Sequence, residues 1–149
     1  MNRDFVEMLS ALSAAGVEYL IVGAYAMAAH GWPRATGDID IWVRPTPDNA
    51  ARVMRALGAY GAPLFDLTAA DLTRPDTVFQ IGIPPGRVDI LSGVSGIEFA
   101  EAWASRITVR LAGVEAPTIG LDALLKNKLA AGRPKDLADI AWLRSRTNR

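Results

Sequence analysis

Two aspartates, Asp38 and Asp40, lie two residues apart in the stretch GDIDIWV, which otherwise has the composition of a buried strand. Aspartate is a poor strand residue and is rarely buried unless it is paired or bound to metal. Strand side chains alternate between two faces, so both carboxylates point one way while Ile39 and Ile41 can face the core. Adjacent anions repel, and a divalent cation would remove that conflict. Oxygen ligands favour Mg²⁺ or Mn²⁺.

A third carboxylate, Asp89, lies in the apolar stretch RVDIL, between Val88 and Ile90. If this strand neighbours the strand of Asp38 and Asp40, three carboxylates converge. Three converging carboxylates can hold two metal ions about 3.5–4 Å apart, an arrangement suited to phosphoryl transfer. The alternative interpretation is structural: Asp38 caps the start of its strand and Asp40 pairs with an arginine.

Phosphate groups would need a second feature, and VGAYAM offers one. It predicts a strand, then Gly23, then the N-terminus of a helix, where backbone N–H groups and the helix dipole favour anions. A tight turn explains a single glycine equally well. The combination is more informative: Gly23-Ala24, then thirteen residues, then Asp-Ile-Asp, and later Asp89.

The elements that must position these groups follow from the pattern along the chain. Helices are predicted at about 2–15, directly after Gly23, from Pro47 to about Tyr60 with Thr46 as N-cap, and at about 97–104. Strands are predicted at about 17–22, 38–43, 77–83 and 87–91, and ITVRLAGVEAPTI predicts a hairpin that turns at Ala112-Gly113. Residues 61–76 fit no clear pattern. Hairpins mixed with crossovers imply an α/β (α+β) fold with a mixed sheet flanked by helices.

The chain is predicted to be one domain, 1–149, with a core at about 1–117 and a C-terminal helical pair at about 120–146. Lys+Arg and Asp+Glu both number 16, so there is no overall bias towards polyanions. The absence of cysteine suits the cytoplasm, and neither a signal-peptide pattern nor a membrane-spanning run is present.

Taken together, VGAYAMAAHGWPRATGDIDIWV and RVDIL resemble the signature of the DNA polymerase β-like nucleotidyltransferase superfamily. Within it the sequence is most similar to small stand-alone members, the minimal nucleotidyltransferases and AbiEii-type proteins. KLAAGRPKDLADIAWL resembles their C-terminal helical segment. The resemblance spans about residues 17–44, 86–91 and 120–143.

The resemblance implies that Asp38 and Asp40 bind two metal ions, and that Asp89 binds the catalytic metal and helps to deprotonate the acceptor hydroxyl. It also implies that the Gly23-Ala24 turn contacts the triphosphate of an NTP substrate. Ala24 replaces the usual Gly or Ser, so a hydroxyl is absent while the backbone N–H groups remain.

Further cationic and polar residues are candidates for nucleotide contacts. Arg34 and Thr36 precede the aspartate pair and could reach a phosphate, or could simply be a solvated arginine and a residue that shapes the loop. Lys128 lies within the segment that resembles the family. Asp136 and Asp139 share a helix face and are interpreted as structural partners of Lys135 or Arg133. His30, the only histidine, is assigned to capping or packing.

Two functions follow. The first is a metal-dependent transfer of a nucleoside monophosphate from an NTP to an acceptor hydroxyl on a protein, a tRNA or a small molecule, with release of pyrophosphate. The second is an antitoxin-like or regulatory partner of a helical toxin, with weak or lost catalysis. Because 149 residues leave little room for an added substrate domain, a partner or a homodimer is expected to complete the site.

Overall fold

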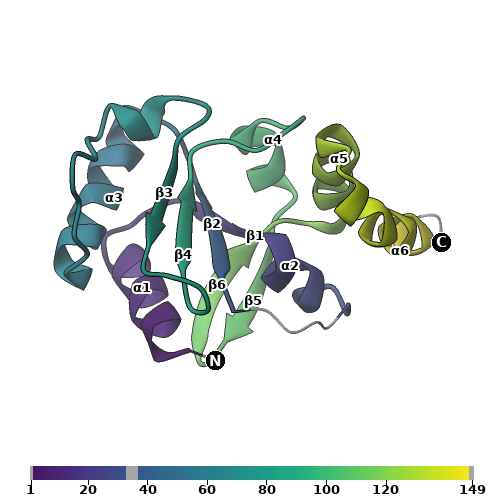
Figure 1. Cartoon of the computed structure of the whole chain (residues 1–149), viewed down its shortest axis with the longest axis horizontal. Coiled ribbons are helices and arrows are strands. Elements are labelled where there is room, and N and C mark those ends of the chain that lie inside the picture. Colours follow the sequence, from purple (N-terminus) through teal and green to yellow (C-terminus); the bar gives the residue numbers. More distant parts are fainter. Residues whose placement is uncertain (1, 33–36, 148–149) are drawn as a thin grey trace.

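The computed structural model of the chain describes residues 2–32 and 37–147. This described part contains one sheet of six strands in the order β3-β4-β2-β1-β6-β5 (Figure 1). The strands are β1 (Tyr19–Val22), β2 (Ile39–Val43), β3 (Val78–Ile81), β4 (Val88–Leu91), β5 (Ile107–Leu111) and β6 (Val114–Thr118). β1 pairs with β6 and β2 with β4 in parallel, while the other pairings are antiparallel. The predicted mixed sheet is confirmed.

Helices cover both faces of this sheet. They are α1 (Arg3–Ala14), α2 (Gly23–Ala29), α3 (Pro47–Tyr60), α4 (Phe99–Ala104), α5 (Leu121–Ala131) and α6 (Leu137–Thr147), with 3-10 turns at Asp71–Thr73 and Pro134–Asp136. The element order predicted from the sequence is confirmed. So is the cap of α3, where the Thr46 side chain accepts the N–H of Asn49 at 3.4 Å and Pro47 begins the helix.

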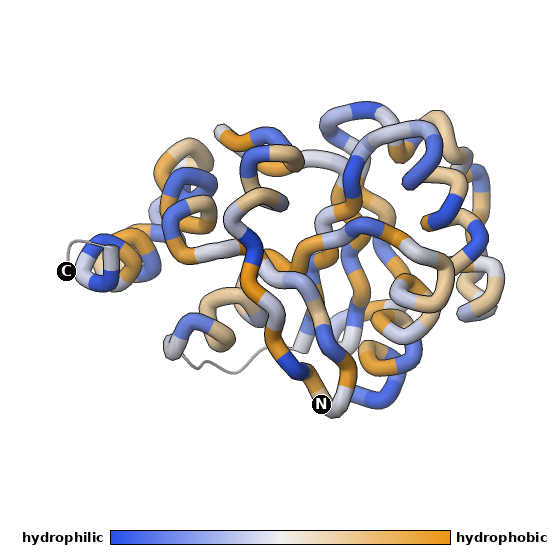
Figure 2. The backbone as a smooth tube through the Cα atoms, turned by 180° about the vertical axis from the view of Figure 1, so that it is seen from behind, coloured by the Kyte–Doolittle hydropathy of each residue, from blue (hydrophilic) through white to orange (hydrophobic). Residues whose placement is uncertain are grey.

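Two hydrophobic cores lie on opposite faces of the sheet. In one, α1 and α3 pack on Ile39, Ile41 and Ile90. In the other, α2, α4, α5 and α6 pack around Leu20 and Trp42. Figure 2 shows the result as apolar stretches along the central strands and polar stretches in the turns and on the outer helices. The period-two alternation of β2 therefore places Asp40 and Trp42 together on the second face.

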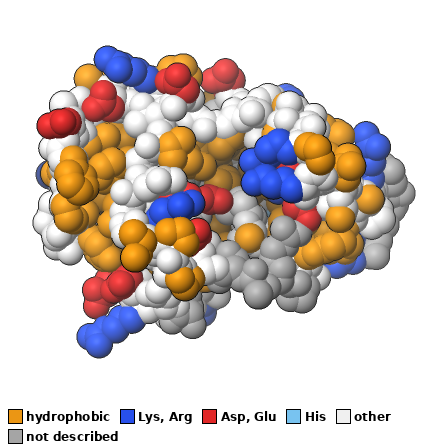
Figure 3. Space-filling view, viewed as in Figure 1, with side chains coloured by type: hydrophobic (Ala, Val, Ile, Leu, Met, Phe, Trp, Pro, Cys, Tyr) orange, Lys and Arg blue, Asp and Glu red, His pale blue; other side chains and the backbone are white. Residues whose placement is uncertain are grey.

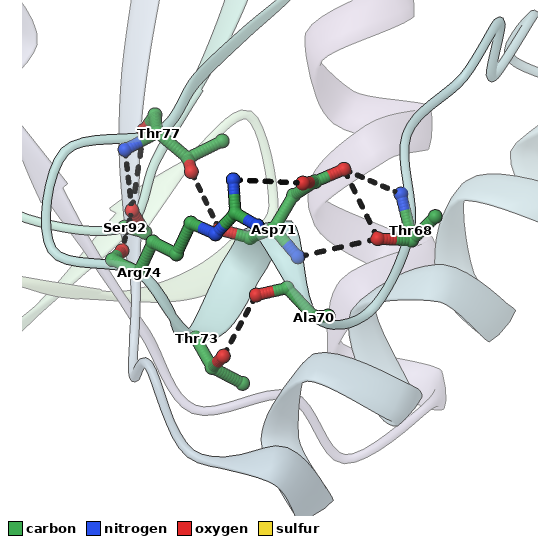
Figure 4. Close-up of polar contacts among 7 residues, drawn as sticks. All are labelled: Thr68, Ala70, Asp71, Thr73, Arg74, Thr77 and Ser92. Carbon is green, nitrogen blue, oxygen red and sulfur yellow. Dashed lines mark hydrogen bonds and ion pairs between the residues drawn. The ribbon is translucent and has the colours of Figure 1, made fainter.

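Residues 61–76, which matched no pattern, form a loop held by polar contacts (Figure 4). The Asp71 carboxylate accepts the backbone N–H and the hydroxyl of Thr68 at 2.9 and 3.1 Å. Ser92, directly after β4, donates its hydroxyl to the carbonyl of Arg74 and accepts the N–H of Thr77 at 2.8 Å. Side-chain contacts between distant segments, rather than local periodicity, define this loop. It leads the chain into β3 beside the end of β4.

Candidate active site

Asp40 and Asp89 lie side by side in the centre of the sheet. β2 and β4 are parallel neighbours, and their register pairs the Cα atoms of Asp40 and Asp89. Their flanking residues Ile39, Ile41 and Ile90 belong to the opposite core, so both carboxylates face the side that carries α2 and α4. The convergence predicted for these two residues therefore follows from strand register and alternation.

Asp38 precedes β2 and is held by the turn between β3 and β4. Its Oδ1 accepts the backbone N–H groups of Gly86 and Arg87 at 3.2 and 3.0 Å. The turn packs directly on Gly37, where a Cβ atom would lie 2.6 Å from the Cβ of Pro85. The glycine of GDIDIWV thus allows a segment nearly fifty residues away to orient the first carboxylate.

Arg87 bridges Asp89 and Asp38. Its Nε and Nη2 donate to the two oxygens of Asp89 at 2.7 and 3.1 Å, and Nη2 lies 3.6 Å from Oδ2 of Asp38. We call Asp38, Asp40, Arg87 and Asp89 the strand cluster. Its three carboxylates face a single guanidinium, so within the cluster negative charge is in excess.

The electrostatic consequence falls on Asp40. The pKa of Asp40 is raised from 3.8 to about 6, and burial is the largest cause. The charge of Asp89, a hydrogen bond with it and the charge of Asp38 act in the same direction, while the charge of Arg87 opposes them. Proximity to a like charge and desolvation both favour the protonated form. The site therefore holds a carboxyl group that ionises near neutral pH.

Gly23 lies against this carboxyl group. It adopts φ +69°, and a Cβ there would lie 2.3 Å from Oδ2 of Asp40. Both the backbone conformation and the space require glycine. The close approach to Asp40 is thus sufficient to explain Gly23, and its contact with phosphate stays a prediction. Ala24 follows it and lines the same cleft.

A cleft of about 510 Å³ opens over the strand cluster. One wall comprises the three aspartates, Arg87 and the Gly23-Ala24 turn. The other comprises residues of α5 and of the connection to α6, including Asn127, Lys128, Arg133 and Lys135. Figure 3 shows basic side chains beside α5 across a hollow from a place over the central strands where basic and acidic side chains meet. An anionic ligand would meet cations on one side and carboxylates on the other.

Lys128, predicted to bind nucleotide, is buried among a second set of charged side chains near the C-terminal end of α5. Its Nζ lies 3.2 Å from Oδ1 of Asp136 and 3.0 Å from Oδ2 of Asp139. Arg133 Nε donates to Oδ2 of Asp136 at 2.7 Å. Burial raises the pKa of Asp136, but hydrogen bonds from Arg133 and Lys128 outweigh it and leave that pKa below its usual value.

We call Lys128, Arg133, Asp136 and Asp139 the helix cluster. The structural role interpreted for Asp136, with Arg133 as partner, agrees with these contacts, and Lys128 is the further partner that the sequence did not indicate. A contact between Lys128 and nucleotide stays a prediction, since its ammonium group already meets two carboxylates. His30 fits its packing role, with Nε2 at 2.8 Å from the carbonyl oxygen of Ile119.

The fit of a divalent metal rests on the donor set of the strand cluster. Among residues 2–32 and 37–147, no three acidic or histidine side chains are arranged to hold a metal ion as they stand. In the strand cluster, Arg87 engages both oxygens of Asp89. The donors themselves are all carboxylate oxygens with an excess of negative charge, the chemistry that Mg²⁺ and Mn²⁺ require. The donor types therefore suit such ions, although their arrangement in this structure does not form a metal site.

A second cavity of about 270 Å³ lies next to the cleft, and Val94 lines both. Trp42, Ser92, Glu98 and Phe99 also line it. Trp42 pairs with Leu91 one alternation further along β2 and β4 than Asp40 and Asp89, on the same face. The indole Nε1 of Trp42 is buried and has no hydrogen-bond partner among the described residues.

Two predicted nucleotide-binding residues, Arg34 and Thr36, lie outside the described residues. Arg87 is the residue of the site that the sequence interpretation missed. A signal was present, because Arg87 stands two residues before Asp89 and alternation places both on one strand face. An arginine in that position beside an acidic pair is the expected counter-ion.

Solved structures with a similar arrangement of elements include a candidate nucleotidyltransferase, an antibiotic-resistance factor and an adenylyltransferase. The candidate nucleotidyltransferase TM1012 of Thermotoga maritima matches with a TM-score of 0.63 and 18% identity over 96% of this chain and 92% of its own. The antibiotic-resistance factor ANT(2'')-Ia matches with a TM-score of 0.62 and 17% identity over 95% of this chain and 79% of its own. LnuA, a lincosamide antibiotic adenylyltransferase with lincomycin bound, matches with a TM-score of 0.60 and 16% identity over 97% of both chains.

No protein-family model matches the chain, and no curated protein sequence matches it. At these low identities the structural similarity defines the fold, which is the nucleotidyltransferase fold that the motifs predicted. Fold alone does not fix function, which has to be argued from the site. In the described part of the chain no helix combines the length and apolar character needed to cross a membrane.

Proposed function

We propose that this chain is a metal-dependent nucleotidyltransferase that transfers a nucleoside monophosphate from an NTP to an acceptor hydroxyl. The observation that carries the proposal is the strand cluster: Asp40 and Asp89 paired in register, with Asp38 oriented beside them, in a cleft of about 510 Å³. That volume lies within the range of small-molecule sites. Basic residues on the facing wall suit a polyanionic substrate.

Asp38, Asp40 and Asp89 would hold two divalent cations, Mg²⁺ or Mn²⁺. Such ions supply neutralisation of the phosphate oxygens and hold the attacking and leaving groups in line. The chain itself contributes orientation: two backbone N–H groups fix the carboxylate of Asp38, and Gly23, which has no Cβ, leaves room for that of Asp40. Pre-oriented carboxylates of this kind reduce the rearrangement that is needed when the substrate arrives, which is then confined to the side chain of Arg87.

In the proposed reaction the oxygen of the acceptor hydroxyl attacks the α-phosphorus. A new phosphorus–oxygen bond forms, the bond from the α-phosphorus to the bridging oxygen breaks, and pyrophosphate leaves. The hydroxyl proton passes to Asp89, the base assigned by family resemblance. Asp89 can accept that proton only after its oxygens are released from Arg87.

The triphosphate would lie along the cleft. The backbone N–H groups at Gly23 and Ala24, together with Arg34, Thr36 and Lys128, are the proposed contacts. Ala24 offers no hydroxyl, so the turn would act through its backbone alone. The first experiment is to identify the NTP that the protein uses, by incubating the protein and Mg²⁺ with each labelled triphosphate and measuring product formation.

The second cavity is the proposed place of the acceptor. It lies beside the cleft that holds the carboxylates, with Val94 lining both, and Trp42, Phe99 and Glu98 form part of its wall. Its volume of about 270 Å³ suits one ring-sized group. This favours a small-molecule acceptor over a protein or a tRNA. The structural neighbours LnuA and ANT(2'')-Ia carry antibiotic names, which makes hydroxyl-bearing antibiotics a reasonable first panel.

The test combines each labelled NTP with Mg²⁺ and acceptors of all three classes, followed by mass spectrometry of the acceptors. A mass increase equal to one nucleoside monophosphate, absent with Asp38→Asn protein, supports the proposal. Equal product from wild-type and Asp38→Asn protein would rule out the assigned site. A helical toxin partner and a homodimer remain predictions, for which size-exclusion chromatography with light scattering gives the mass of the purified protein.

A further inference from the structure

The bidentate contact of Arg87 with Asp89 uses the oxygens that the proposed reaction needs. A guanidinium and a divalent cation cannot share the same two oxygens, because both approach along the same lone pairs. Arg87 also lies 3.6 Å from Asp38. In the structure Arg87 therefore takes the place of a cation between the carboxylates of two strands.

The backbone of Arg87 is tied to β2, whereas its guanidinium is held by carboxylates at the edge of the cleft. Its N–H donates to Asp38, and its carbonyl accepts the N–H of Ile39 at 3.0 Å, which ties the residue to β2. The guanidinium end lies in the cleft, and a quarter of the side chain is exposed. The side chain can thus change partner without any movement of the strands.

We propose that Arg87 is a positioning residue that exchanges partners: it neutralises Asp89 and Asp38 before substrate binds, and moves to the phosphates when metal and nucleotide arrive. This inference rests on the proposed function. The planar guanidinium suits phosphate in the same two-pronged geometry that it uses with Asp89. The released carboxylate is then free to act on the acceptor hydroxyl.

The exchange makes two opposite predictions for Arg87→Gln. Without the competing guanidinium, Mn²⁺ alone binds at least roughly tenfold more tightly, since a close charge of like sign is removed. The complex of Mn²⁺ with a non-hydrolysable NTP analogue binds roughly tenfold more weakly, because a charge-assisted phosphate contact is lost. A purely structural role for Arg87 would not move the two affinities in opposite directions.

Binding of Mn²⁺ alone is measured from the free-ion signal in electron paramagnetic resonance at pH 8, and binding of the Mn²⁺–analogue complex by isothermal titration calorimetry. Arg110→Gln is the matched control, because Arg110 is exposed and pairs with Glu115 on the β5–β6 hairpin. Arg87→Lys retains the positive charge but lacks the two-pronged guanidinium. Both of its affinities should therefore lie between those of wild type and Arg87→Gln. It also replaces Arg87→Gln as the test if that variant does not fold, as judged by circular dichroism.

The outcomes separate this inference from the proposed function. Tighter Mn²⁺ and weaker nucleotide binding support the exchange. If wild type binds both ligands and Arg87→Gln matches it, or changes both affinities in the same direction, the exchange is wrong while the proposed function stands. If neither protein binds Mn²⁺ at millimolar concentration, both proposals are overturned.

Discussion

The strand cluster and the helix cluster are built from the same kinds of side chain, but their charges are balanced differently. In the helix cluster, two carboxylates face one ammonium and one guanidinium, and the aspartates are almost fully buried. In the strand cluster, three carboxylates face one guanidinium beside an open cleft. A balanced, buried group of charges fits a structural role, whereas the excess of negative charge at the cleft is the basis for our proposal that the strand cluster binds cations.

The two clusters also shift the pKa of aspartate in opposite directions. Hydrogen bonds from Arg133 and Lys128 lower the pKa of Asp136 despite its burial. Burial and the neighbouring carboxylates raise the pKa of Asp40 to about 6. At Asp136 the donated hydrogen bonds outweigh the effect of burial on the pKa, whereas at Asp40 the neighbouring carboxylates add to it. A pKa that is raised by burial and by neighbouring like charges in a cleft is typical of functional sites.

The largest effect is expected from breaking the helix cluster with Lys128→Met. Two buried carboxylates would then share only Arg133, and removal of one partner from a buried ion pair costs about 3–5 kcal/mol. The free energy of unfolding, measured by urea denaturation, should fall by that amount. Lys126→Met is the control on the same helix: Lys126 pairs with the exposed Glu101, and such pairs contribute about 0–1 kcal/mol. Equal losses in both variants would contradict the structural role.

In contrast to Lys128→Met, Asp40→Asn should raise the stability of the protein and lower its activity. It removes a charge from the overloaded strand cluster, so the melting temperature in metal-free buffer at pH 7.5 should rise. Nucleotide transfer should fall by roughly 100- to 1000-fold, the usual loss when a group that stabilises transition-state charge is removed. Glu115→Gln, an exposed acidic residue on β6, controls for the change in net charge. A destabilised Asp40→Asn protein with normal activity would reverse the assignment of the two clusters.

The pH dependence of stability tests whether Asp40 has the raised pKa that distinguishes the strand cluster from the helix cluster. In the unfolded chain Asp40 ionises near 3.8, and in the folded protein near 6. Between these values the folded state retains a proton that the unfolded state has lost, so stability falls as pH rises from about 4 to about 7. Asp40→Asn should lack this decline. The measurement is the difference in melting temperature between wild type and variant, in EDTA, across that range; parallel curves would show that Asp40 does not titrate there.

The sequence predicted the strand cluster better than the helix cluster, for a physical reason. Alternation along a strand is local, so the shared face of Asp38 and Asp40 and the apolar setting of Asp89 could be recognised without a structure. The contact of Asp38 with the amides of Gly86 and Arg87 joins segments nearly fifty residues apart and depends on how a hairpin packs.

Lys128 illustrates what could not be predicted. Its position in the family-like segment suggested a ligand contact, but its partners Asp136 and Asp139 are set by the angle at which α6 meets α5. Local spacing did indicate the Arg133–Asp136 contact, which lies within one helical turn. Tertiary packing, not residue type, decided which cation became buried.

The smallest change in stability is expected from Arg133→Gln. This substitution tests whether Arg133 or Lys128 is the more important counter-ion in the helix cluster. Half of the Arg133 side chain is exposed, so its bond to Asp136 is partly screened by water, while Lys128 stays buried against the same carboxylate. The loss should be about 1 kcal/mol, in the range of a single hydrogen bond, and should shrink in 1 M salt. Urea denaturation at low and high salt gives both values. A loss as large as that of Lys128→Met would mean that Arg133, rather than the buried lysine, holds the two helices together.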